Sequence, residues 1–190
     1  MTRLVVLGDS VPAGERTDGP GWPRRLPRLL EELAEDDVSI HGGMGTSLAE
    51  LATDAEEVLP DAPSGDLLVV VHAGHNDAQL RGGEPRVDPG RVRAAAANLD
   101  GLLSARADRY AFLGLVPLLS LEEPGAVPFS DAQPERSLEY DEILAETVGT
   151  HLPVAEPVGA WRERTVDGVH PGEAGHAYLA EQVADWLSRS

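Results

Sequence analysis

Residues 67–71 are apolar at every position, and three of the five are valines. An alternating pattern leaves one face of a strand to water, whereas a continuous apolar run of this length is typical of a strand buried on both faces. Such strands occur almost only in parallel sheets that helices cover on both sides. The segment Leu4–Leu7 repeats the pattern near the N-terminus. The sequence therefore predicts an α/β protein.

Further short apolar segments alternate with stretches of helical spacing along the rest of the chain. Strands are expected at residues 38–40, 110–115 and 152–155, and helices after Trp22, from Ser47 to Val58, over 87–107, over 134–150 and after His176. Five strands that alternate with helices predict a three-layer α/β/α sandwich around a mostly parallel sheet. At 190 residues the chain has the length of one domain, and we expect a single domain over residues 1–190.

The composition limits the classes of partner and of chemistry. A net charge of −18 disfavours nucleic acids, anionic membranes and, more weakly, anionic substrates. Cysteine is absent, which excludes disulfides, thiolate catalysis and metal sites built on cysteine. All 15 basic residues are arginine, which excludes Schiff-base chemistry on a lysine. The histidines do not follow the spacing of zinc ligands, so no metal is expected.

Neither a membrane anchor nor an export signal is recognisable in the sequence. No apolar run approaches the ~20 residues that a membrane-spanning helix needs. The N-terminus enters a strand directly, without a basic region followed by a long apolar segment. We therefore expect a cytoplasmic protein without a membrane span.

Polar side chains follow three of the predicted strands at the point where each strand ends. Gly8-Asp9-Ser10 ends the first strand, a glycine-rich segment over 41–47 follows the second, and Asn76 follows the run at 67–71. Ligands of open parallel sheets bind at the carboxyl ends of the strands. A serine at such a point has its hydroxyl exposed on a rigid element, which suits a nucleophile, although the same turn also serves simply to end a strand.

The glycine-rich segment over 41–47 has two interpretations. Glycines at a strand-to-helix junction let the backbone approach a ligand and direct its N–H groups outward, as in phosphate-binding loops. This segment lacks a lysine, the Walker spacing and the dinucleotide fingerprint. A site for a transient oxyanion fits it better, with the N–H of Gly45 and the amide of Asn76 as candidate donors.

Asp167 and His170 lie three residues apart in a turn before the last helix. This spacing lets the carboxylate bind one imidazole nitrogen and leave the other free as a base. All of these turns are expected on one edge of the sheet. A serine, a base, an orienting carboxylate and oxyanion donors meet the requirements of nucleophilic acyl transfer.

Four features have a plain structural interpretation beside a functional one. His75 is either a base or a residue that supports the site from behind or from its rim, and Trp22 either faces a substrate or packs a helix start into the core. His176 is expected on a helix surface. The proline-containing segment 116–133 is either a lid or a surface connection.

Four blocks of the sequence, in this order, resemble the SGNH hydrolases, also called GDSL-type esterases and lipases. The nucleophile block of the family is resembled by Gly8-Asp9-Ser10 together with Gly14 and residues 21–23. Residues 42–47 resemble the glycine block, and residues 74–77 resemble the Gly-x-Asn-Asp block. Residues 167–170 resemble the Asp-x-x-His block. Ile40 stands where the family usually has an asparagine five residues before the oxyanion glycine. This departure leaves Gly43 open as an alternative to Gly45.

The resemblance implies a flavodoxin-like fold and a mechanism without metal or cofactor. Ser10 would attack the carbonyl of a small-molecule ester or thioester, with His170 as base and Asp167 as its orienting partner. The oxyanion would be held by the backbone N–H groups of Ser10 and Gly45 and by the Asn76 side chain. Asp9 would tie the nucleophile turn to neighbouring loops.

The same site is also compatible with two other functions. It would serve an acyltransferase that passes the acyl group to an alcohol or amine. A binding module that kept the fold without activity is the other alternative.

Overall fold

Five parallel strands form the centre of the protein. The computed structural model describes residues 2–60, 65–81, 84–119 and 134–189. The strand order is β2-β1-β3-β6-β7, and every neighbouring pair is parallel. The strands are β1 (Arg3–Asp9), β2 (Val38–Gly43), β3 (Leu67–His72), β6 (Arg109–Leu113) and β7 (His151–Leu152).

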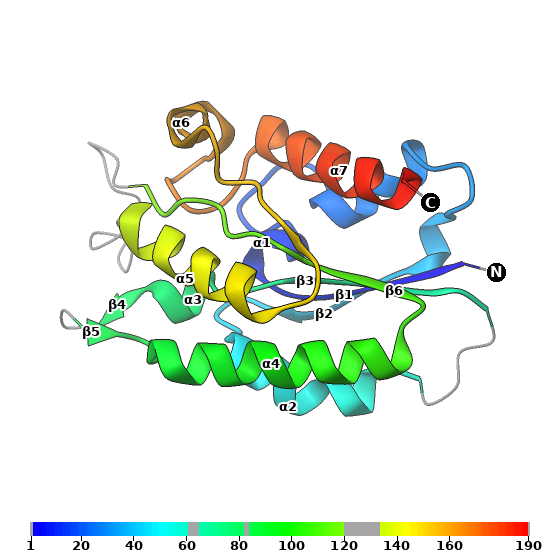
Figure 1. Cartoon of the computed structure of the whole chain (residues 1–190). Helices are drawn as coiled ribbons and strands as arrows, with labels where there is room; N and C mark the ends of the chain where they lie inside the picture. Colours follow the sequence, from blue (N-terminus) through cyan, green and yellow to red (C-terminus); the bar gives the residue numbers. More distant parts are fainter. Residues whose placement is uncertain (1, 61–64, 82–83, 120–133, 190) are drawn as a thin grey trace.

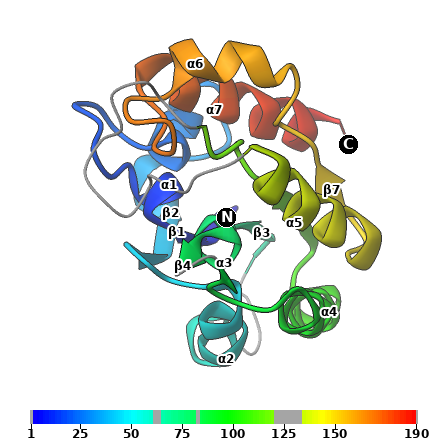
Figure 2. The same cartoon turned by 90° about the vertical axis from the view of Figure 1, so that its left-hand side faces the viewer.

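Helices cover both faces of this sheet, so the fold is the predicted three-layer α/β/α sandwich (Figures 1 and 2). One face carries α2 (Leu48–Val58), α4 (Pro89–Arg106) and α5 (Pro134–Thr147), and the other carries the 3-10 helix η1 (Trp22–Arg28), α6 (Trp161–Arg164) and α7 (Glu173–Ser188). Short elements complete the chain: α1 (Ser10–Ala13), η2 (Glu35–Asp37), α3 (His75–Ala78), the hairpin strands β4 (Leu80–Arg81) and β5 (Glu84–Pro85), and η4 (Val158–Ala160).

The central strand β1 shows why a continuous apolar run is needed here. Val5 and Leu7 pack with α2 and α4, whereas Leu4 and Val6 pack with η1 and α7. All four side chains are at most 2% exposed. Each face of the strand therefore contributes to a separate apolar core.

The predicted elements differ from the observed ones mainly where prolines occur. The helix expected after Trp22 is a 3-10 helix that ends at Arg28, with Pro23 at its start and Pro27 inside it. Proline has no N–H to donate, which disfavours a longer α-helix. Pro153 follows β7 directly, and the strand expected over 152–155 ends at Leu152.

Two glycines allow the backbones of β1 and β2 to pack closely below the nucleophile turn. A Cβ on Gly8 would overlap the ring of Pro12, and a Cβ on Gly42 would overlap the carbonyl oxygen of Gly8. Gly42 also has a φ of +101°, which side chains rarely adopt. The turn after β1 therefore requires glycine on both strands.

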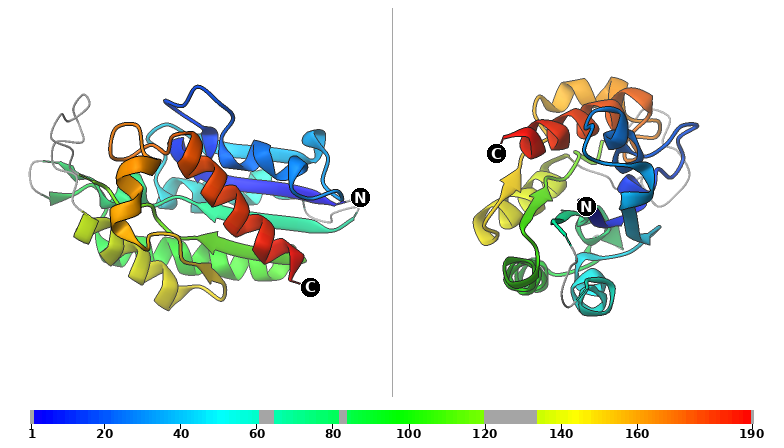
Figure 3. Two further views of the ribbon diagram at one scale, coloured as in Figure 1. Left: turned by 90° about the horizontal axis from the view of Figure 1, so that it is seen from above. Right: turned by 90° about the vertical axis from the view of Figure 1, so that its right-hand side faces the viewer.

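Both termini lie at the opposite end of the molecule from β4 and β5 (Figures 1 and 3). The carboxyl ends of the strands point toward that hairpin. Within the described residues, no helix is both long and apolar enough to cross a membrane.

His176 contradicts the expectation of a surface position. Its side chain is 0% exposed, and neither ring nitrogen has a hydrogen-bond partner among the described residues. Burial, with a further contribution from Arg25, lowers the pKa of His176 to about 4. The neutral imidazole therefore packs as a core side chain. Trp22 is also fully buried, as expected for a residue that packs in the core.

We predict that His176→Leu reduces the loss of stability in acid. Between pH 6.5 and about 4 the unfolded chain binds a proton on His176 that the folded chain excludes. Stability from this group is complete above pH 6.5 and falls by about 3 kcal/mol as the pH drops through that window. Urea unfolding at pH 8 and pH 4.5 measures the difference. Equal losses in the variant and the wild type would contradict the prediction.

Candidate active site

The turn that carries Ser10 is organised by the carboxylate of Asp9. β1 ends at Asp9, and its Oδ1 accepts a hydrogen bond of 2.9 Å from the N–H of Val11 at the start of α1. α1 ends after one turn at Gly14, whose φ of +77° permits the left-handed conformation. Ser10 is therefore the first residue of a short helix, and its side chain is 6% exposed.

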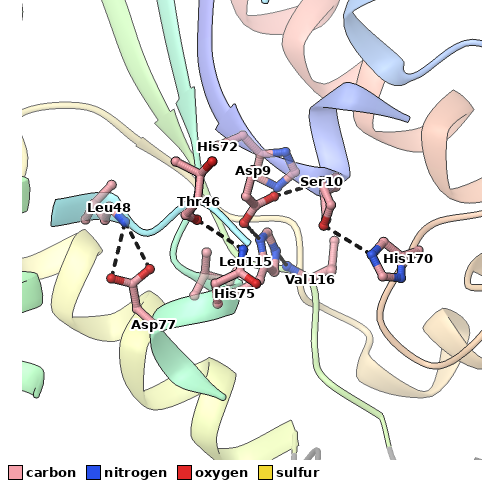
Figure 4. Close-up of polar contacts among 12 residues, drawn as sticks. Asp9, Ser10, Thr46, Leu48, His72, His75, Asp77, Leu115, Val116 and His170 are labelled. Atoms are coloured by element: carbon pink, nitrogen blue, oxygen red, sulfur yellow. Dashed lines mark hydrogen bonds and ion pairs between the residues drawn. The ribbon is translucent and has the colours of Figure 1, made fainter. Parts of the chain in front are cut away.

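A buried chain of hydrogen bonds connects this turn to two other strand ends (Figure 4). The second oxygen of Asp9, Oδ2, lies 2.8 Å from Nδ1 of His75, and Nε2 of His75 accepts a 3.0 Å bond from the N–H of Val116. Because Nε2 accepts, the ring proton is on Nδ1 and is donated to Asp9. Both ring nitrogens of His75 are therefore engaged by Asp9 and Val116. These contacts fit the interpretation of His75 as a residue that supports the site.

The carboxylate of Asp9 is ionised although it is fully buried. Burial on its own would raise the pKa of Asp9, but the contacts with His75 and the hydrogen bond from Val11 lower it below its ordinary value. Asp9 is thus bonded to the first turn of α1 through one oxygen and to His75 through the other.

Asp167 shapes the turn that carries His170. Its Oδ1 accepts hydrogen bonds from the N–H groups of Val169 and His170, at 3.0 and 2.8 Å. Gly168 has a φ of +85°, and the N–H of Val166 closes the turn on the carbonyl oxygen of His170 at 2.9 Å. The same carboxylate therefore builds the turn and contacts the imidazole.

The imidazole of His170 lies between a carboxylate and a hydroxyl. Nδ1 is 2.8 Å from Oδ2 of Asp167, and Nε2 is 3.1 Å from Oγ of Ser10. With the ring proton on Nδ1, Nε2 can accept the proton of the serine hydroxyl. Residues that are 160 positions apart in the sequence thus form one hydrogen-bonded series.

Asp167 also has a cationic partner that the sequence analysis did not identify. Nη1 of Arg16 lies 3.0 Å from Oδ2 of Asp167. Burial alone would raise the pKa of Asp167, but the hydrogen bonds from the side chain and backbone of His170 lower it far below its usual range. The carboxylate is therefore ionised beside His170. Arg16 has a φ of +60°, a conformation that is uncommon for residues other than glycine.

The glycine block distinguishes Gly45 from Gly43. The N–H of Gly43 donates to Oγ1 of Thr46 at 3.1 Å, whereas the N–H of Gly45 has no acceptor among the described residues. The amide of Asn76 donates one hydrogen to the carbonyl oxygen of Thr46 at 3.0 Å, which leaves its other hydrogen available. Gly45 and Asn76 therefore each keep an N–H without an acceptor among the described residues.

Asp77, the neighbour of Asn76, holds the start of helix α2 in place. Both of its carboxylate oxygens accept from the N–H of Leu48, at 3.2 and 3.0 Å (Figure 4). Ser47 and Glu50 add a capping box at the start of α2. Burial raises the pKa of Asp77 to about 6. The segment between β2 and α2 is thus fixed at its C-terminal end by a residue whose role the sequence analysis did not assign.

These residues surround a cleft of about 180 Å³. Its lining residues are Ser10, Arg16, Met44, Gly45, His75, Asn76, Gln79, Arg86, Val169 and His170. Arg16, Gln79 and Arg86 were missed by sequence reasoning, because nothing in their local pattern marks them as neighbours of Ser10. Most of the segment 116–133 lies outside the described residues, whereas 116–119 are described, with Val116 fully buried.

Comparisons with known proteins find relatives of this chain in both sequence and fold. The family model described as GDSL-like lipase/acylhydrolase matches residues 6–178. A GDSL lipase of Mycobacterium tuberculosis is 27% identical over 206 aligned positions, which cover 99% of this chain and 82% of the relative.

Solved structures of low sequence identity share the fold. A member of the lipolytic G-D-S-L family from Veillonella parvula has a TM-score of 0.74 at 18% identity, with 100% of both chains covered. An acetylxylan esterase from Geobacillus stearothermophilus has a TM-score of 0.67 at 20% identity, with 99% of this chain and 94% of that chain covered.

We predict that His75→Leu destabilises the protein by about 3–5 kcal/mol, because it leaves Oδ2 of the buried, ionised Asp9 carboxylate without a partner. His75→Asn is the matched control, since its amide keeps a donor near the position of Nδ1. Urea unfolding at pH 7 measures both variants. An equal loss in the free energy of unfolding for the two variants would show that the hydrogen bond to Asp9 does not stabilise the fold.

Proposed function

The chain belongs to the GDSL-like lipase/acylhydrolase family, and from this premise we propose that it hydrolyses a carboxylic ester or thioester through an acyl-enzyme on Ser10. The observation that carries the proposal is the continuous contact from Ser10 Oγ to His170 Nε2 and from His170 Nδ1 to Asp167 Oδ2, at 3.1 and 2.8 Å. This contact opens on a cleft of about 180 Å³, which suits a small acyl group.

In the first half of the reaction, Oγ of Ser10 attacks the carbonyl carbon while its proton passes to Nε2 of His170. The carbon–oxygen double bond opens and places a negative charge on the carbonyl oxygen. When the intermediate collapses, the bond to the leaving oxygen or sulfur breaks, and the leaving group takes the proton from His170. The product of this half is the ester of Ser10.

In the second half, water takes the place of the leaving group. Its proton passes to Nε2 of His170 as its oxygen attacks the acyl carbon. Collapse of the second intermediate releases the carboxylic acid and returns the proton to Oγ of Ser10. Asp167 stays ionised throughout and stabilises the imidazolium that forms twice per cycle. An alcohol or amine in place of water would make the same site an acyltransferase.

Three donors stabilise the oxyanion in both halves: the N–H groups of Ser10 and Gly45 and the amide of Asn76. Gly45 is assigned in preference to Gly43 because the N–H of Gly43 already donates to Thr46. These donors are fixed before substrate binds, because Asn76 is bonded to Thr46 and α2 is capped by Asp77. Preorganised donors of this kind usually make the largest single contribution to lowering the barrier.

We predict that Ser10→Ala abolishes hydrolysis of p-nitrophenyl esters. Wild type and variant are compared on a series from acetate to palmitate. The chain length with the highest turnover indicates the length of acyl chain that the pocket accommodates. Ser104→Ala is the matched control, because Ser104 is exposed on α4. Product analysis with added alcohols and amines separates a hydrolase from an acyltransferase. Turnover that survives the loss of Oγ would overturn the proposal.

We predict that Asn76→Ala lowers kcat by about 10²–10³-fold, the usual cost of removing one oxyanion donor. KM should change little, because the donor acts mainly on the charge that develops in the transition state. Asn98→Ala, at an exposed position of α4, is the control. A thermal melt of each variant checks that the fold is intact. A loss of tenfold or less would remove Asn76 from this role.

A further inference from the structure

The charged side chains that line the cleft beside Ser10 are arginines, although the protein as a whole is acidic. The chain has 33 acidic and 15 basic residues, with a net charge of −18. Two arginines, Arg16 and Arg86, line the cleft, and its described lining includes no aspartate or glutamate. Because Arg16 is paired with Asp167, Arg86 is the lining arginine whose charge has no carboxylate partner among the described residues.

Arg86 is placed at the cleft by the short hairpin of β4 and β5. Its N–H donates to the carbonyl oxygen of Gln79 at 2.7 Å, so the two residues face each other at the base of the hairpin. Its Nη2 donates to the carbonyl oxygen of Gly45 at 2.6 Å. The guanidinium thus lies directly beside the glycine whose N–H faces the oxyanion.

Most of the hydrogen-bonding capacity of Arg86 is unused within the described part of the chain. A guanidinium has five N–H donors, and the structure assigns one acceptor, the carbonyl oxygen of Gly45. Glu50 and Asp77 act on Arg86 only at a distance, since their carboxylates are bonded to Ser47 and Leu48. No carboxylate among the described residues forms an ion pair with Arg86. Its charge is therefore available to a ligand in the cleft.

The position of Arg86 relative to His170 identifies the part of the substrate that it meets. His170 must give its proton to the leaving group, so the leaving group lies on the side of Nε2. Figure 4 shows His170 and Thr46 on opposite sides of Ser10, and Arg86 is bonded to Gly45, the residue before Thr46. Arg86 is accordingly on the side of the cleft away from the leaving group, and of the two arms of an ester we infer that it meets the acyl chain.

We propose that Arg86, with Gln79 beside it, binds a carboxylate at the far end of the acyl chain, so that the preferred substrates are esters or thioesters of dicarboxylic acids. Guanidinium and carboxylate groups form paired, charge-assisted hydrogen bonds. This inference rests on the proposed function of Ser10. The acidic surface does not oppose it strongly, because at physiological salt distant charges are screened over about 8 Å, whereas Arg86 is in the cleft itself.

The test compares matched pairs of p-nitrophenyl esters that differ only in a terminal carboxylate. The monoesters of adipic, pimelic and suberic acid are set against the hexanoate, heptanoate and octanoate. In the wild type, kcat/KM for the best anionic member should exceed that of its neutral partner by about tenfold, the size expected for one charge-assisted pair. In Arg86→Gln this ratio should fall to near one, with turnover of the neutral ester less affected.

Two controls separate the possible causes. Arg93→Gln removes the same charge from an exposed position where Arg93 pairs with Glu146, and it should leave the ratio unchanged. Equal losses on both esters in Arg86→Gln would mean that Arg86 only positions Gly45, and a wild-type ratio near one would also overturn the inference. Loss of neutral-ester turnover in Ser10→Ala tests the proposed function separately.

A binding measurement covers the case in which neither ester is turned over. Adipate and hexanoate are titrated calorimetrically into the Ser10→Ala protein, which cannot acylate. Adipate should bind at least about tenfold more tightly than hexanoate, and Arg86→Gln in this background should remove the difference. Equal binding of the two acids would overturn the inference whatever reaction Ser10 performs.

Discussion

The parallel pairing of β1 with both of its neighbours is the constraint on which the site depends. Gly8 lies opposite Gly42 on one side and His72 on the other, so the three chains leave the sheet at the same level. Ser10, Gly45 and Asn76 then follow within a few residues of those strand ends. Because apolar packing on both faces fixes the register, the same forces that stabilise the core also place the reacting groups.

The sheet brings the strand ends close together, and buried polar contacts then fix the positions of the turns that follow them. Asp9, His75 and Val116 link the ends of three strands through buried hydrogen bonds, and Asp77 fixes the start of α2. Each of these groups is costly to bury without a partner, so the arrangement is stable only when all the contacts are formed together. The segments that carry Gly45 and Asn76 are therefore held in place by the fold itself.

The sequence was sufficient for the fold class because continuous apolar strands and helical spacing are local signals. The proximity of Ser10, Asn76, Asp167 and His170 could also be expected, because segments that follow the carboxyl ends of parallel strands meet at the same edge of the sheet. His176 was assigned wrongly, because a polar residue at a helical position does not reveal that its neutral ring is buried. Arg16 and Arg86 were missed, since long side chains reach the cleft only through tertiary contacts that no local pattern encodes. Prolines at 27 and 153 shortened two elements that apolar spacing alone extends too far.

The hairpin that carries Arg86 belongs to neither helical layer and to no strand of the main sheet. It joins the body through the backbone bonds from Arg86 to Gln79 and from Val87 to Asp77, and residues 79, 80 and 84–86 belong to neither apolar core. A change of sequence or length there alters the wall of the cleft without disturbing the strands that hold Ser10. The architecture thus separates the strands that position Ser10 from a short hairpin that forms part of the cleft wall.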